Sequence, residues 1–142
     1  MILPDLNLLL HAYNRHVAQH ARAKQWWESV LNGRELIGLP LEVTLGFVRI
    51  ATNSRMGAAA VSLAAARGVV DSWSESLVVR VLIQSEDHSA KVLDLLERSE
   101  ASGLLTSDAF LAVYAIEARA KLCANDSDFA RFPRLQWENP LL

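Results

Sequence analysis

Acidic side chains recur where the chain passes from an apolar strand or a turn into a helix. Asp5 ends the apolar start of the chain, Asp108 and Asp126 stand at two later turns of this kind, and Asp128 follows closely. Glu42 lies in the first turn of another predicted helix. In an open parallel α/β sheet, such corners gather at the carboxyl edge of the strands. We therefore expect these carboxylates on one rim of the molecule.

Several carboxylates in one pocket favour a particular chemistry. They repel one another, which raises the pKa of some of them, and a hard divalent cation relieves that repulsion. A ligand set made only of oxygen atoms favours Mg²⁺ or Mn²⁺ over zinc. Such an ion can activate a water molecule and stabilise the leaving oxygen of a phosphodiester. The sequence has no glycine-rich phosphate-binding motif and no nucleophile elbow that would offer a competing catalytic device.

A second interpretation of the same acids needs no metal. Asp is a favoured residue at the N-cap of a helix, and Glu in a first turn is stabilised by the helix dipole. Each of the acids could therefore serve only to start a helix. From the residues alone, capping and a metal pocket both remain open.

The elements that must position these acids follow from the spacing of the apolar residues. Strands are expected at residues 2–3, 36–39, 77–82, 121–124 and 135–138. Helices are expected at residues 6–13, 16–31, 41–51, 58–73, 85–99 and 109–119. Strands that alternate with helices predict an α/β fold with a parallel sheet covered on both faces. The chain of 142 residues is expected to form a single domain, residues 1–142.

The net charge argues at first against nucleic acid as a partner. The chain has 14 basic and 16 acidic side chains and a net charge of −2, whereas a general nucleic-acid coat protein has a basic excess. If four or five acids are sequestered in a metal site, the remaining surface is positive by two or three charges. An RNA substrate is then compatible with the composition.

The remaining composition excludes several other classes of protein. The only cysteine, Cys123, cannot form an internal disulfide or a cysteine-rich zinc site, so a reducing, cytoplasmic setting is expected. Its apolar strand predicts an inert core residue. No signal peptide or membrane-spanning segment is expected either.

Five segments occur in the order and at the separations of a known family. They are Leu3–Leu10, Gly38–Pro40, Phe47–Asn53, Thr106–Asp108 and Leu122–Pro133. The chain resembles the PIN-domain ribonucleases, in particular the VapC-like toxins of toxin–antitoxin pairs, over essentially its whole length. The resemblance implies a three-layer α/β/α domain around a short, mainly parallel sheet of about five strands. It also implies a Mg²⁺-dependent endoribonuclease, with Mn²⁺ as a substitute, that cleaves cellular RNA.

The resemblance assigns roles to individual residues. Asp5, Asp108 and Asp126 match the acids that bind the metal, and Asp128 matches the second acid of the last motif, a further candidate ligand. Asn7 matches a small polar residue that would orient a carboxylate or a water molecule from behind the metal ligands.

Two positions depart from the family pattern. Glu42 is the only acid available for the family's helical glutamate, although the surrounding signature suggests a position near Thr44. The last motif usually has Thr or Ser where this chain has Ala124, and Asn125 could substitute for the missing hydroxyl.

The resemblance further implies two partners besides RNA. VapC-like proteins form homodimers, and each is inhibited by a cognate antitoxin. The antitoxin's C-terminal tail lies in a groove across the active site, where its basic side chains neutralise the acids.

Other residues allow both a functional and a structural interpretation. Arg49 and Arg55 could contact RNA phosphates or simply lie at a solvated helix end. His16 and His20 have the spacing of metal ligands on one helix face, but no third ligand is evident and a solvated helix start is expected.

The neighbouring Trp26 and Trp27 are expected to divide their roles. One should fill the core, and the other could cover a dimer or partner surface or stack on RNA bases.

Two rival functions remain. A receiver-like phosphoryl-accepting domain needs an adjacent pair of acids near the first strand and a lysine after the last one, but Asp5 stands alone and Lys121 precedes its strand. An inactive PIN domain that only binds RNA or protein is compatible with Ala124 and with a Glu42 that points away from the site.

Overall fold

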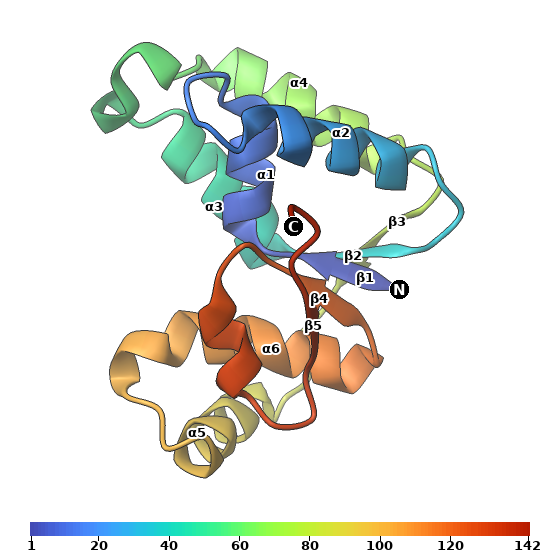
Figure 1. Cartoon of the computed structure of the whole chain (residues 1–142). Coiled ribbons are helices and arrows are strands. Elements are labelled where there is room, and N and C mark those ends of the chain that lie inside the picture. Colours follow the sequence, from blue (N-terminus) through green and yellow to red (C-terminus); the bar gives the residue numbers. More distant parts are fainter.

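A five-stranded sheet lies between two layers of helices in the computed structural model, which describes residues 1–142 (Figure 1). The strands are β1 (Ile2–Pro4), β2 (Ile37–Pro40), β3 (Val79–Leu82), β4 (Lys121–Cys123) and β5 (Gln136–Glu138). Their order in the sheet is β3-β2-β1-β4-β5, and every neighbouring pair is parallel. The predicted α/β/α architecture with a short sheet of five strands is confirmed.

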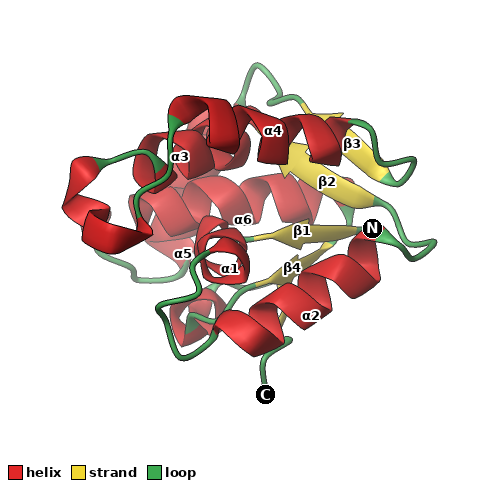
Figure 2. Cartoon of the chain, turned by 90° about the horizontal axis from the view of Figure 1, so that it is seen from above, coloured by secondary structure: helices red, strands yellow, loops and turns green.

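The helices divide between the two faces of the sheet. They are α1 (Leu6–Tyr13), α2 (His20–Leu31), α3 (Leu41–Ala51), α4 (Leu63–Ser74), α5 (His88–Arg98) and α6 (Thr106–Ala118), with short 3₁₀ helices η1 (Ser54–Ala59), η2 (Gly103–Leu105) and η3 (Ser127–Arg131). Helices α1 to α4 cover one face, and α5 and α6 cover the other (Figures 1 and 2). None of the helices combines the length and the apolar character needed to cross a bilayer.

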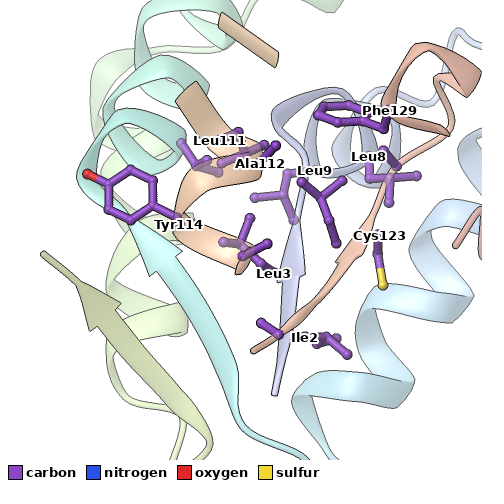
Figure 3. Close-up of a cluster of buried hydrophobic side chains, with 14 of the residues drawn as sticks. Ile2, Leu3, Leu8, Leu9, Leu111, Ala112, Tyr114, Cys123 and Phe129 are labelled. Carbon is purple, nitrogen blue, oxygen red and sulfur yellow. The ribbon is translucent and has the colours of Figure 1, made fainter. Parts of the chain in front are cut away.

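The core follows from the position of β1 and α6. Both faces of the central strand are covered, so Ile2 and Leu3 are buried although they point in opposite directions. Helix α6 is apolar on nearly all sides and packs between the sheet and α5. Figure 3 shows its Leu111 and Ala112 in the core cluster with Leu3 and Leu9. The strand before Asp5 and the helix that carries Asp108 are therefore anchored in the core.

Two predicted helices begin later than their apolar spacing indicated. Helix α2 starts at His20, because the Asn14 side chain accepts the backbone N–H of His16 at 3.0 Å and holds a turn there. Helix α4 starts at Leu63, where the Ser62 hydroxyl caps the helix by accepting the Ala65 N–H at 3.1 Å. Local turn and cap chemistry thus overrides the helix propensity of residues 58–62.

Smaller differences concern β3, α5 and α6. Strand β3 begins at Val79 rather than at residue 77, and α5 begins at His88 rather than at residue 85. Helix α6 begins at Thr106, three residues before the predicted start. Asp108 therefore lies inside the first turn of this helix rather than in front of it, where its carboxylate meets the positive end of the helix dipole.

Candidate metal centre and catalytic cleft

Two acids come together because β1 and β4 are neighbours in the sheet. Asp5 follows β1, and its backbone N–H donates to the Cys123 carbonyl of β4 at 2.8 Å, which extends the pairing by one residue. Asp126 follows the end of β4. The strand order reverses between these two strands, which is where ligand sites form in open parallel sheets.

Asp5 is the most buried of the acids, with 8% of its surface exposed. Burial raises the pKa of its carboxyl to about 6, and the negative charge of Asp108 adds to that rise, with a smaller contribution from Asp126. The backbone N–H groups of Leu6 and Asn7 act in the opposite direction. A buried acid whose pKa is raised among like charges marks a candidate functional site.

Three further acids form a compact group beside Asp5. Asp108, Asp126 and Asp128 each offer a carboxylate oxygen, and these atoms all lie within 4.8 Å of one another. Burial raises the pKa of Asp108, and the charges of Asp126 and Asp128 raise it further. A donor set of carboxylate oxygens that repel one another fits a hard divalent cation.

The capping interpretation is tested by the hydrogen bonds at these helix starts. Asp126 does act as a cap, because its Oδ1 accepts the backbone N–H of Asp128 at 2.8 Å. Asp5 occupies the N-cap of α1 but makes no side-chain capping bond. Asp126 is thus the acid with a clear capping hydrogen bond, whereas Asp5 only lies near the Leu6 and Asn7 N–H groups. Glu42 and Asp108 stand in first turns, where the helix dipole favours an acid.

A cleft of about 480 Å³ opens on this edge of the sheet, between α1, α3 and α6. Its polar lining includes Asp5, Asn7, Glu42, Arg49 and Asp108. Asp108 thus belongs both to the compact group of acids and to the cleft.

Of the two candidate positions on α3, Glu42 lines this cleft and Thr44 does not. Its carboxylate accepts a hydrogen bond from the Tyr114 hydroxyl, at 3.1 Å for Oε2 and 3.3 Å for Oε1. Gly46, one turn further along α3, lets α1 approach closely, because a Cβ there would lie 2.9 Å from Leu6 Cδ2. Helices α1 and α3 pack against each other here, so Asp5, just before α1, and Glu42 of α3 line one cleft.

Sequence comparison now decides the family. The model of the PIN domain matches residues 2–135. This chain belongs to the PIN domain family. Ribonuclease VapC33 of Mycobacterium tuberculosis is 41% identical to this PIN domain over 141 residues, which are 99% of each chain. Ribonuclease VapC43 of the same organism is 34% identical over 141 residues, 99% of this chain and 96% of its own. These similarities confirm the resemblance that the motifs indicated.

Solved structures support the fold of this PIN domain. VapC20 of M. tuberculosis, a toxin that cleaves the sarcin–ricin loop, superposes with a TM-score of 0.70 at 19% identity, covering 96% of this chain and 99% of that one. VapBC2 of Rickettsia felis, bound to a DNA fragment from its promoter, gives a TM-score of 0.70 at 20% identity and 98% coverage of both chains.

The two predicted RNA-binding arginines separate in the PIN domain. Arg49 lines the acidic cleft, two turns after Glu42 on the same face of α3. Arg55 is exposed in η1 and does not line that cleft. Asn7 lies in the cleft and is exposed, which fits contact with a carboxylate or with solvent.

Asn125 has a partner other than the acids. Its Oδ1 accepts a hydrogen bond from Asn139 Nδ2 at 3.0 Å, so its amide faces the C-terminal segment. Ala124 is fully buried between β4 and β5, where its carbonyl accepts the Trp137 indole N–H at 3.2 Å. The role of Asn125 in place of the missing hydroxyl stays a prediction; its observed hydrogen bond ties the turn before Asp126 to the C-terminal segment.

The histidine pair does not form a metal site. His16 lies in a turn ahead of α2, and the His20 ring is within 2.9 Å of the His11 carbonyl through Nδ1. The tryptophans divide as expected: Trp27 is buried in the core, and Trp26 is partly buried against it.

Cys123 is buried, and burial raises the pKa of its thiol to about 12. It is therefore an unreactive core residue, as predicted.

Sequence reasoning missed Tyr114 and Asn139. Tyr114 donates a hydrogen bond to Glu42 from 72 residues along the chain, and Asn139, just after β5, donates one to Asn125. In the sequence, Tyr114 fits the pattern of the apolar positions of a core helix. Nothing in the sequence therefore indicated that its hydroxyl would contact a cleft residue.

Proposed function

We propose that this PIN domain is a Mg²⁺-dependent endoribonuclease toxin of a toxin–antitoxin pair. The observation that carries the proposal is the convergence of Asp5, Asp108 and Asp126 from three separate elements at the edge where β1 and β4 end. The names of its VapC relatives, which are ribonucleases, supply the reaction class.

The residues divide the work of hydrolysis. Asp5, Asp108 and Asp126 would hold the ion, and Asp128 would help to position it or the attacking water. A bound divalent cation supplies an activated water molecule and stabilises the leaving oxygen of the phosphodiester. Glu42 accepts a hydrogen bond from the attacking water and orients it. No side chain becomes covalently attached to the RNA, and Mn²⁺ is expected to replace Mg²⁺.

Arg49 contributes to substrate binding in this proposal. It is the cationic side chain that lines the cleft together with the acids, so it is placed to contact an RNA phosphate. Arg49→Ala should raise the KM for RNA on the order of fivefold to tenfold through loss of one phosphate contact, and that increase should shrink at high salt. Arg55→Ala serves as the matched control and should leave the KM unchanged. An equal effect of both variants would contradict the role of Arg49.

The expected partners follow from the family and from the complexes among its structural neighbours. The substrate is cellular RNA such as tRNA, rRNA or mRNA. The neighbours include toxin–antitoxin complexes, which supports a cognate antitoxin that covers the acidic cleft. We also expect the protein to form a homodimer and to act in the cytoplasm.

A Mg²⁺ titration by calorimetry, run beside an RNA cleavage assay, tests the function. The wild-type protein should bind Mg²⁺ and cleave RNA, whereas Asp5→Asn and Asp108→Asn should abolish cleavage and relieve growth arrest in cells. Retained activity in both variants would refute the assignment. Mg²⁺ binding without cleavage would favour an inactive module that only binds RNA or protein, the alternative that Ala124 raises.

A further inference from the structure

Tyr114 lies at an unusual junction between the core and the catalytic cleft. It sits on α6, six residues after Asp108, and only 4% of its surface is exposed. Its hydroxyl nevertheless reaches the exposed Glu42, donating to the carboxylate at 3.1 and 3.3 Å. The hydrogen bond thus joins α3 to the helix that carries Asp108.

Neighbouring rings hold the Tyr114 side chain in this direction. The His88 ring centroid lies 4.4 Å from that of Tyr114, and the Phe110 ring lies 5.4 Å away, perpendicular to it. His88 is itself buried and fixed, because its Nε2 lies 3.0 Å from the Phe110 carbonyl, which can only accept a hydrogen bond. In Figure 3 the Tyr114 hydroxyl points away from the other labelled core side chains.

The Tyr114 hydroxyl remains a donor at any working pH. Burial and the neighbouring Glu42 charge raise the pKa of Tyr114 to about 12, so the phenol keeps its proton. An exposed glutamate has several open rotamers, and a donor held by packed rings restricts it to the one that meets the hydroxyl.

We propose that Tyr114 is a positioning residue that holds the Glu42 carboxylate in its working orientation within the cleft shared with Asp5 and Asp108. Glu42 is exposed on α3, and its orientation depends on Tyr114, which comes from the helical layer on the other face of the sheet. Since this role is defined by what Glu42 does, the inference rests on the proposed ribonuclease function.

The test compares Tyr114→Phe with Tyr13→Phe, which removes the hydroxyl of the chain's only other tyrosine. Tyr13 is on α1, in the other helical layer, and its hydroxyl bonds to tryptophans rather than to a cleft residue. Tyr114→Phe should lower kcat about tenfold with little change in the KM for RNA, as expected when a catalytic group is misplaced rather than removed. Tyr13→Phe, assayed at a temperature where it is folded, should leave kcat unchanged.

A double-mutant cycle with Glu42→Gln identifies the path of the effect. Tyr114→Phe should cause no further loss of kcat once Glu42 is replaced, because both changes remove the same arrangement. Additive losses, or an unchanged kcat in Tyr114→Phe, would overturn the inference. A thermal unfolding curve of each variant separates this effect from a loss of folded protein.

A second readout does not depend on activity. In the metal-free protein, the carboxyl ¹³C NMR resonance of Glu42 should move in Tyr114→Phe and stay in place in Tyr13→Phe. An unmoved resonance would overturn the positioning role. If the wild type fails to cleave RNA in Mg²⁺, the proposed function falls, while this resonance still decides whether Tyr114 controls Glu42.

Discussion

Asp5→Asn should stabilise the metal-free protein while it destroys activity. The carboxylate of Asp5 is buried beside Asp108 and Asp126, and burial and these charges raise its pKa from 3.8 to about 6. The folded protein therefore holds an ionised group in an unfavourable place at neutral pH. Asn has nearly the same shape and no charge, so it removes that cost.

The size and pH dependence of this effect follow from linkage. A carboxyl whose folded-state pKa lies above its unfolded value loses stability as pH rises between the two values. Here that window runs from pH 3.8 to about 6, and the full difference corresponds to about 3 kcal/mol. Asp5→Asn should therefore gain up to about 3 kcal/mol at pH 7.5, about half of that at pH 5, and little near pH 4.

Urea unfolding in EDTA at these three pH values measures the effect as a free energy of unfolding. Added Mg²⁺ should stabilise the wild type, through binding to the folded state, and should close most of the gap to Asp5→Asn. A variant that is less stable than the wild type at pH 7.5, or a difference that does not change with pH, would refute the electrostatic account of this site.

Two further substitutions test how the core and the C-terminal segment support the site. Tyr13→Phe leaves the indole N–H groups of Trp27 and Trp73 without the acceptor that they share at 3.3 and 2.9 Å, so urea unfolding should show a loss of about 1–3 kcal/mol. Asn139→Ala removes its bonds to Asn125 and to the backbone of Leu141; unfolding should show a loss of about 1–2 kcal/mol, and calorimetry a weaker affinity for Mg²⁺. An unchanged Mg²⁺ affinity would mean that the Asp126 turn keeps its shape without Asn139.

The general architecture could be predicted from the sequence because each element carries its own periodicity. Helices 6–13 and 41–51 have the predicted bounds, since their apolar faces and their ends are local features. The predicted start of α4 was wrong. The alanines at residues 58–60 favour a helix, but Gly57 has a φ of +58°, which is not helical, and Ser62 caps the helix only at residue 63. The exact start of a helix therefore depends on single residues that favour or oppose the helical conformation.

The acids could be placed on one edge by a rule about parallel sheets, which needs only the order of strands and helices. The hydrogen bond from Tyr114 to Glu42 could not be predicted from the sequence. The two residues are 72 positions apart and meet only because α3 and α6 both pack on the sheet. The partner of Asn125 could not be predicted for the same reason, because the pairing of β4 with β5 brings Asn139 to it.

End-group analysis of a defined RNA, cleaved by the metal-free protein after addition of Mg²⁺, tests the central claim most directly. Attack by a water molecule held at Asp5, Asp108 and Asp126 does not use the ribose 2′-hydroxyl. The products should therefore lack a 2′,3′-cyclic phosphate, and they should form only with Mg²⁺ or Mn²⁺ and not with Asp108→Asn. Cyclic phosphate ends, or cleavage that persists in EDTA, would contradict a metal-centred hydrolase.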